Sequence, residues 1–156
     1  LEAAWYTGNF SLSSFSAGEH SFSVVARDSE NMTSMNQSFR YEGIVSTELN
    51  VTSFTLQMKS GSTETRNIQI FNSGNVVVDT EISAEDLVSE KDVIPKHAIA
   101  VFENVWLPLE NPIFLNANVA PQTRKEFAFR VETPVQARSG HYTGKITITS
   151  MESRND

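Results

Sequence analysis

The chain has 156 residues and a net charge of −7, and this acidic balance argues against nucleic-acid binding, which needs a basic stripe to neutralise phosphates. It contains no cysteine, which excludes disulfides, thiolate metal sites and cysteine nucleophiles. No apolar run approaches the ~20 residues of a membrane-spanning helix, so no membrane insertion of this chain is expected. No charged-then-apolar signal begins at Leu1, and we expect a mature product or a piece of a longer protein.

The first segment, residues 1–43, consists of predicted strands separated by polar turns. Residues 18–28, GEHSFSVVARD, alternate exposed and buried types and end in an Asp before a Ser-Glu-Asn turn. This pattern predicts a strand with its exit turn. A shorter strand is expected around residues 10–12, and a final one at residues 37–41.

This segment resembles the C-terminal half of the immunoglobulin-like modules repeated in secreted prokaryotic proteins. The likeness is carried by Leu12, Gly18, His20, Phe22, Val24, Ala26, Asp28 and Asn31. The resemblance implies the last strands of an immunoglobulin-like sandwich and says almost nothing about activity. Half a sandwich leaves an open sheet with an unpaired edge. We therefore expect its missing strands to come from outside residues 1–43, either from upstream in a longer polypeptide or from another chain.

A linker is predicted at residues 44–47, followed by one complete domain over residues 48–150 and a tail at residues 151–156. Alternation and breakers predict strands at 48–51, 54–58, 65–71, 76–82, 99–102, 105–107, 113–115, 127–131 and 141–150. The run Asn72-Ser73-Gly74-Asn75 tolerates positive φ and predicts a hairpin turn. The capping-box-like start at Ser83 predicts a single helical turn through Leu87.

Residues 46–150 also resemble a family, the immunoglobulin-like modules of archaeal and bacterial surface proteins and of carbohydrate-active enzymes. The matching segments are residues 72–76, 86–87, 94–95 with Ile99, 119–121 and 139–146. The segment before Val119 is longer than the family pattern, and Trp106-Leu107-Pro108-Leu109 within it has no assigned role. The resemblance implies a spacer, assembly or display module without catalytic residues. The expected fold is thus all-β, with tandem immunoglobulin-like β-sandwiches of which the first is incomplete.

Candidate catalytic residues are few. The three histidines, His20, His97 and His141, are interpreted as structural. His20 and His141 lie at the entries to predicted strands, where an exposed or capping imidazole is common. No serine lies in a G-x-S-x-G elbow or a Ser-x-x-Lys motif. We therefore expect no enzymatic activity.

Two acidic clusters raise the question of calcium. One surrounds a predicted short turn and comprises Glu85, Asp86, Glu90 and Asp92. The other follows the strand of the first segment and comprises Asp28, Glu30 and Asn31. A solvated face and a self-capping Asx turn are the favoured interpretations, with Ca²⁺ as the alternative because hard oxygen ligands gather at both places. No other cofactor is expected.

Four N-glycosylation sequons occur, at Asn9, Asn31, Asn36 and Asn50. The first four asparagines of the chain all qualify and the later eight do not, a distribution that chance rarely gives. We interpret it as support for N-linked glycans, which would shield loops and strand edges. Ordinary polar turns are the competing account.

Three classes of function fit these features. We favour a structural module of an extracellular surface layer, filament or stalk, whose partners are neighbouring subunits or domains of the same protein. The second class is a glycan- or protein-binding adhesion module, which requires exposed rings, and Trp5, Tyr6 and Trp106 are its candidates. The third is an accessory domain of a larger secreted hydrolase. Solvent exposure of the three rings tests the second class, and the full-length sequence tests the third.

Overall fold

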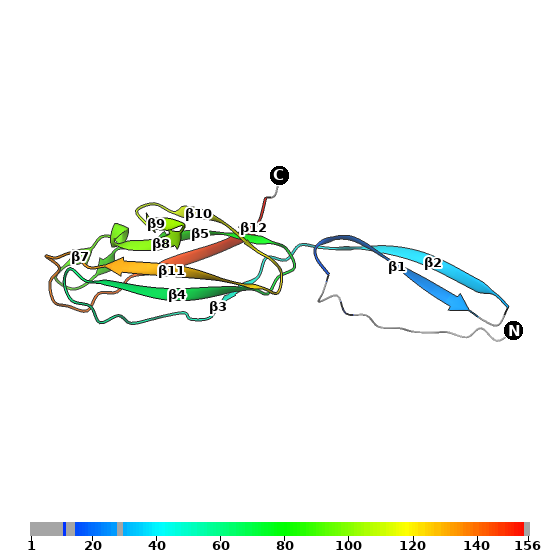
Figure 1. Ribbon diagram of the computed structural model, residues 1–156, viewed down its shortest axis with the longest axis horizontal. Helices are drawn as coiled ribbons and strands as arrows, with labels where there is room; N and C mark the ends of the chain where they lie inside the picture. Colours follow the sequence, from blue (N-terminus) through cyan, green and yellow to red (C-terminus); the bar gives the residue numbers. More distant parts are fainter. Residues whose placement is uncertain (1–10, 12–14, 28–29, 155–156) are drawn as a thin grey trace.

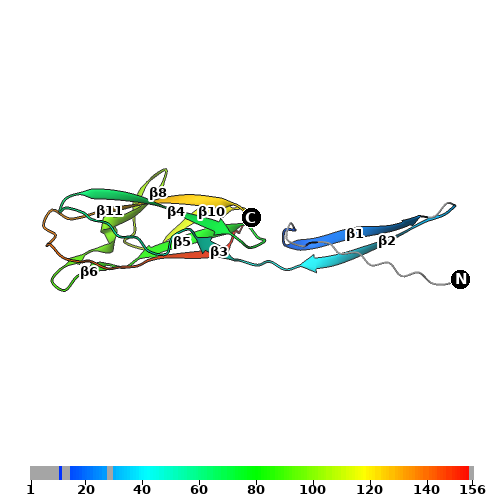
Figure 2. The ribbon, with the colours of Figure 1, turned by 90° about the horizontal axis from the view of Figure 1, so that it is seen from below.

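The computed structural model describes residues 11, 15–27 and 30–154, and this part of the chain is all-β. A long two-stranded ribbon projects from one end of a pair of facing sheets, and the two parts lie along one axis (Figure 1; Figure 2). Within the described residues, no helix has the length and apolarity needed to cross a membrane.

The ribbon consists of β1 (Gly18–Arg27) and β2 (Met32–Tyr41), two antiparallel strands of equal length. They pair without interruption from Gly18 opposite Tyr41 to Arg27 opposite Met32. The predicted strand at 18–28 is therefore found. The predicted strand at 37–41 is also found, as the last part of β2, which begins five residues earlier at Met32 and has 10 residues.

The facing sheets form the two-sheet unit. Its larger sheet has five strands in the order β3-β4-β11-β8-β9. Their bounds are β3 Thr47–Leu49, β4 Thr63–Asn72, β11 Arg124–Glu132, β8 Ile99–Glu103 and β9 Val105–Pro108. The smaller sheet has the order β10-β5-β12, with β10 Ile113–Val119, β5 Val78–Ala84 and β12 Ile146–Glu152. A short pair, β6 (Leu87–Val88) with β7 (Val93–Ile94), and a 3₁₀ turn, η1 (Lys96–Ala98), complete the unit.

The hydrophobic core lies between the two sheets. Alternation along β4 and β11 turns every second side chain inward, and Ile70 and Phe129 are almost fully buried there. The smaller sheet contributes Val78, Ile82 and Leu115. The alternating inward residues of β4 and β11 are thus core residues, and each such side chain contributes ~1.5–3 kcal/mol through burial.

The polypeptide enters and leaves the two-sheet unit at the same end, next to the ribbon (Figure 1). The hydroxyls of Thr47, in the first strand, and Ser150, in the last, are 2.9 Å apart. Just beyond β12, the Ser153 N–H donates to the Val77 carbonyl over 2.8 Å. The segments where the chain enters and leaves the two-sheet unit are therefore held at this end by hydrogen bonds.

Four sequence predictions are wrong, and the first three concern the type or bounds of an element. The predicted strand at residues 54–58 is irregular backbone, although Leu56 and Met58 pack against the core as alternation requires. Residues 83–87 form no helical turn, because β5 continues to Ala84 and β6 begins at Leu87. The last strand begins at Ile146 rather than His141, so Tyr142 lies outside it.

The run Asn72-Ser73-Gly74-Asn75 does not form a hairpin. It connects β4 in the larger sheet to β5 in the smaller one, and these strands are not paired. None of its residues has a positive φ. The reason is that the asparagine side chains bind backbone groups elsewhere in the fold, as described below, so the segment crosses between layers.

Candidate functional site

The ribbon has two chemically different faces. Because paired residues share a face, the register places an apolar set on one side: His20, Phe22, Val24, Ala26, Met35 and Phe39. The opposite face is mostly polar, with Glu19, Ser21, Ser23, Ser34, Asn36, Ser38 and Arg40, and it also carries Val25 and Met32. We call these the apolar face and the polar face of the ribbon.

The apolar face is only partly covered. Phe39 contacts the rings of His20, Phe22 and Phe15 at centroid distances of 5.5, 6.3 and 5.8 Å, which makes an aromatic cluster near the base of the ribbon. Farther along, Val24 is 50% exposed and Met35 56%. Neither β1 nor β2 pairs with a third strand within the described chain. The ribbon therefore presents exposed apolar surface and two open edges.

Asn75 joins the ribbon to the two-sheet unit. Its side chain accepts the Ile44 N–H over 2.6 Å and donates to the Glu42 carbonyl over 2.8 Å. Its backbone N–H donates to Ile44 O, and its carbonyl accepts the N–H of Ala17, which precedes β1. Asn75 is buried, and all its polar groups are used. One residue thus binds both chain segments at the base of the ribbon.

Asn72 and Gly74 complete this junction. The Asn72 amide donates to the carbonyls of Val76 and Val119 over 2.7 and 2.8 Å, and its Oδ1 accepts the Gly74 N–H. Gly74 lies so close to the Ile44 carbonyl that an added Cβ would stand 2.1 Å from the oxygen. These short approaches indicate that residues 44–46 are held against the two-sheet unit.

A second surface lies on the outer face of the five-stranded sheet. It includes the residues of β11 that alternate with the buried phenylalanines and point away from the core. Arg130 projects outward, and its guanidinium carbon lies 4.7 Å from the centre of the Trp106 ring. Between them, Ala100 is only 3% exposed although it faces away from the core. Phe102 meets Trp106 at 5.2 Å and remains 46% exposed. The predicted candidate Trp106 is thus half-buried in an outward aromatic group.

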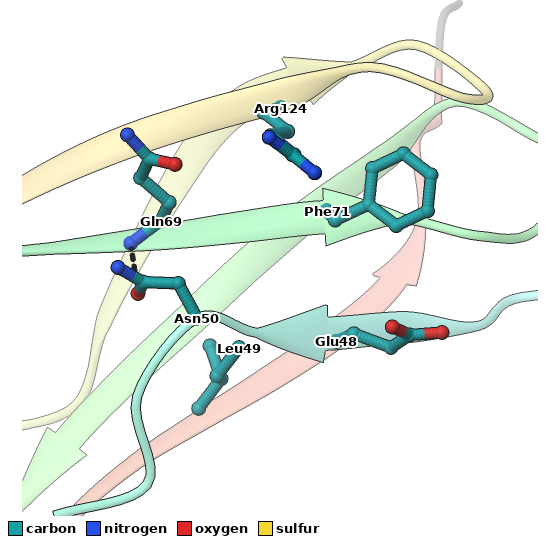
Figure 3. A pocket seen from close by; sticks show the side chains of 6 residues that line it. All are labelled: Glu48, Leu49, Asn50, Gln69, Phe71 and Arg124. Atoms are coloured by element: carbon teal, nitrogen blue, oxygen red, sulfur yellow. Dashed lines mark hydrogen bonds between the residues drawn. The ribbon is translucent and has the colours of Figure 1, made fainter.

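The same face carries another arginine on an aromatic ring, six residues earlier on β11. Arg124 lies 5.5 Å from the centre of the Phe71 ring, its directly paired neighbour on β4. These two residues line a depression of about 190 Å³ together with Glu48, Leu49, Asn50 and Gln69 (Figure 3). The volume is below the ~300 Å³ at which small-molecule pockets begin, so the depression fits only part of a larger ligand.

Glu126 lies between the two arginines on the same face of β11. Its carboxylate accepts hydrogen bonds from the amides of Asn67 at 3.0 Å and Gln69 at 3.4 Å. We call the outward group Phe102, Trp106, Arg130, Glu126, Phe71 and Arg124 the outer strip. It combines aromatic rings, cations and a carboxylate on one sheet face.

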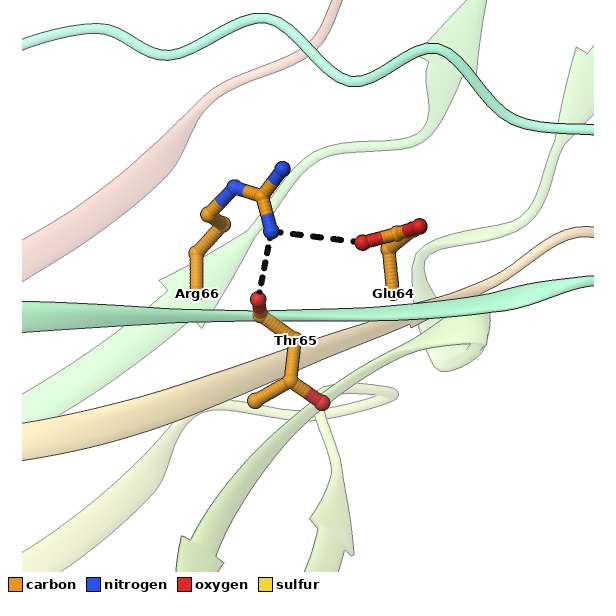
Figure 4. A network of polar contacts seen from close by, with 3 residues as sticks. All are labelled: Glu64, Thr65 and Arg66. Carbon is orange, nitrogen blue, oxygen red and sulfur yellow. Dashed lines mark hydrogen bonds and ion pairs between the residues drawn. The ribbon is translucent and has the colours of Figure 1, made fainter.

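The ion pair between Arg66 and Glu64 lies on β4 outside the outer strip (Figure 4). Arg66 Nη1 is 3.2 Å from Glu64 Oε2 and also donates to the Thr65 carbonyl over 2.8 Å. Both side chains are exposed, so the pair contributes at most ~1 kcal/mol. In the described part of the chain, no carboxylate comes within ion-pair distance of Arg124 or Arg130.

At the far end of the two-sheet unit, Asp92 organises a loop. Its Oδ2 accepts the Arg138 N–H over 2.9 Å and the Tyr142 hydroxyl over 2.8 Å. The Arg138 N–H, followed by the Tyr142 hydroxyl, lowers the pKa of Asp92. Burial, followed by the hydrogen bond to the carboxylate, raises the pKa of Tyr142. We interpret the role of this pair as structural, because its hydrogen bonds stabilise the loop.

The carboxylates of the acidic run serve the backbone. Asp86 Oδ1 accepts the Lys96 N–H over 2.8 Å, and Asp92 Oδ1 accepts the Val93 N–H over 2.9 Å. Among the described residues, no three His, Cys, Asp or Glu side chains are grouped as a metal ion would require. Asp28, part of the other proposed calcium cluster, lies outside the described residues. His20 Nε2 is 2.7 Å from the Ser16 carbonyl.

The described sequons are all exposed. Asn31 precedes β2, and Asn36 lies within β2 on the polar face, opposite Ser23. Asn50 follows β3, and its Oδ1 accepts the Gln69 N–H over 2.7 Å. Asn9 and the candidate binding residues Trp5 and Tyr6 lie outside the described residues.

Sequence reasoning missed the arginine partners of the outer strip. Alternation along β11 already places Arg124 and Arg130 on one face, which was the available signal. Their aromatic partners come from β4 and β9, and that pairing requires the sheet order.

No protein-family model matches the chain, and no curated protein matches it. Among solved structures, the fold is similar to part of a family 123 glycoside hydrolase from Clostridium perfringens, described in a study of glycolipid glycan hydrolysis. The identity is 18% and the TM-score 0.48, over 62% of this chain. The matched region is 19% of that enzyme's chain, so this chain spans about a fifth of its length. At these values the similarity carries no information about activity.

Proposed function

We propose that this chain is a non-catalytic structural module of an extracellular surface assembly, in which β1 and β2 belong to an incomplete immunoglobulin-like sandwich. Strands of a neighbouring domain or subunit complete that sandwich. The two-sheet unit is the second immunoglobulin-like sandwich, and N-linked glycans on the outward asparagines shield the assembly.

The observation that carries the proposal is the partly exposed apolar face of the ribbon. A two-stranded ribbon alone is marginal in water, and this one exposes Val24 and Met35 on its apolar face, with Val25 and Met32 exposed on the otherwise polar side. Added strands would pair the open edges, and a facing sheet would bury the apolar face. The junction at Asn75 supports a linking role, because it fixes the base of the ribbon to the two-sheet unit.

Two adjacent valines provide a matched test. Val24 and Val25 are 50% and 57% exposed, but they point to the apolar and the polar face respectively. Val24→Asp should reduce the fraction of the protein recovered in high-mass surface assemblies of its native host by at least ~10-fold, because it buries an unpaired charge. Val25→Asp should leave that fraction within ~2-fold of wild type.

Equal effects of the two substitutions, or none from either, would contradict the proposal. Sedimentation of the purified chain then distinguishes the two sources of strands. Concentration-dependent association that is lost in Val24→Asp identifies a second subunit, and a monomer at all concentrations identifies a neighbouring domain.

A further inference from the structure

The outer strip has a composition that packing of the two-sheet unit does not require. Its side chains face away from the core, and Phe102 remains almost half exposed on a strand whose inward residues are fully buried. Exposed apolar patches that are rimmed by polar residues mark interaction surfaces, and Phe102 and Trp106 form one aromatic group with charged neighbours. The question is which ligand chemistry this arrangement fits.

We propose that the outer strip binds a neutral, hydroxyl-rich glycan chain lying along β11. The ring of Phe102, which is 46% exposed, offers a flat apolar surface to the C–H face of a sugar ring. Arg124 and Arg130 offer only donors, whereas Glu126 offers only acceptors. Sugar hydroxyls both donate and accept, so a ligand of this class matches every group of the strip.

The charge of this face favours a neutral ligand over an anionic one. Two arginines on the outer face of β11 are accompanied there by Glu126 and Glu132, and Glu48 lies on the same face of β3. Two positive and three negative charges leave this face close to balanced. A polyanion would gain little field attraction here, whereas each guanidinium, held on a ring, keeps its donors directed toward hydroxyl oxygens.

The dimensions favour an extended chain over a single sugar. Arg124 and Arg130 are six residues apart on one strand, which is ~20 Å at the rise of a β-strand. The depression beside Arg124 holds only part of a ligand, and the group around Trp106 lies at the other end. A glycan that contacts both ends must therefore be longer than either contact surface.

The test is binding of the purified full chain to an array of oligosaccharides that contains neutral, uronate-containing and sulfated series. We expect binding to at least one neutral series, which is then titrated by calorimetry. Phe102→Ala and Arg130→Ala should each weaken that binding by at least ~10-fold. The matched control is Phe114→Ala, since Phe114 is 49% exposed on the outer face of the other sheet, and its affinity should stay within ~2-fold of wild type.

Salt dependence gives a second readout. Binding of a neutral chain should change less than ~2-fold between low and high salt, whereas binding through charge falls steeply because salt screens it. No binding to any neutral series, binding to the anionic series alone, or equal loss in Phe114→Ala would overturn the proposal. The outer strip lies on the two-sheet unit, so its failure would leave the proposed role of the ribbon untouched.

Discussion

Two buried asparagines hold the junction between the ribbon and the two-sheet unit. The Asn72 amide binds the carbonyls of Val76 and Val119 within the two-sheet unit. The Asn75 side chain binds the segment that follows β2, and its backbone carbonyl binds Ala17 before β1. Each uses its side-chain donor and acceptor, so removal of either amide would leave buried backbone groups without partners, at ~1–3 kcal/mol each. Gly74 stands between them because no larger residue fits below the Ile44 carbonyl.

Gly74→Ala should destabilise the protein by ~1–3 kcal/mol, because the new methyl group would force the backbone of residues 44–46 away. Gly140→Ala is the control, since a Cβ there meets its nearest atom at 3.6 Å, an ordinary contact. The control should change the free energy of unfolding by less than ~1 kcal/mol. Denaturant midpoints at constant m-value measure both, and equal losses would show that the junction is looser than described.

The Asp92–Tyr142 pair should make stability depend on pH at both extremes. Asp92 has a lowered pKa when folded, so its contribution is present above the unfolded pKa of ~3.9 and is lost as pH falls through the folded value. Tyr142 has a raised pKa, so its contribution is present below ~10 and is lost as pH rises through its folded value. Tyr142→Phe should remove the alkaline loss and weaken the acid loss.

Thermal unfolding across the pH range measures this dependence, with Tyr41→Phe as the control on the ribbon. An alkaline loss that persists unchanged in Tyr142→Phe would assign it to another group. The Asp92 carboxylate would keep its bond from the Arg138 N–H in that variant, so some acid dependence should remain.

At the scale of elements, the ribbon and the two-sheet unit differ in how they are stabilised. The two-sheet unit has a core closed from both sides, whereas the ribbon has one small aromatic cluster and open edges. A chain beginning at Ser46 should therefore fold to a monomer with a cooperative thermal transition, whereas residues 1–43 alone should be unfolded or aggregate. Circular dichroism and sedimentation of the two fragments check this. Cooperative unfolding of isolated 1–43 at low concentration would show that it completes its own core.

Alternation in the sequence correctly predicted the strands that pair with other strands in a sheet. Residues Ile68 and Ile70 on β4, and Phe127 and Phe129 on β11, are inward because period-two patterns coincide with a sheet buried on one side. The same pattern failed at residues 54–58, where side chains reach the core but the backbone joins no ladder. The alternating pattern therefore indicates which side chains are buried, but it does not indicate whether the backbone pairs with another strand.

The candidate surfaces were predictable to different degrees. The amphipathic pattern of β1 is visible in the sequence, so the apolar face of the ribbon could be anticipated from Phe22 and Val24 alone. Trp106 could be named as a candidate ring, but its partnership with Arg130 depends on β9 and β11 flanking β8. The role of Asn75 was hidden for the same reason, since turn chemistry and an interlayer junction use the same residue types.

On the scale of the whole molecule, the ribbon extends the described structure along the axis away from the two-sheet unit (Figure 2). The polar face of the ribbon carries Asn36, and the apolar face is where the proposed facing sheet would lie. A glycan on Asn36 and a partner sheet would therefore occupy opposite sides, so modification and assembly are compatible.

Entry and exit at one end also determine how the molecule would respond to mechanical load. Tension applied between Tyr41 and Ser153 would be borne by the contacts at that end, including the Thr47–Ser150 pair and the bond from Ser153 to Val77. The core, and the loop that Asp92 organises at the opposite end, would lie outside the force path. Under a steady pull, the rest of the two-sheet unit would carry no load. Its core would stay unstrained until the contacts at that end broke.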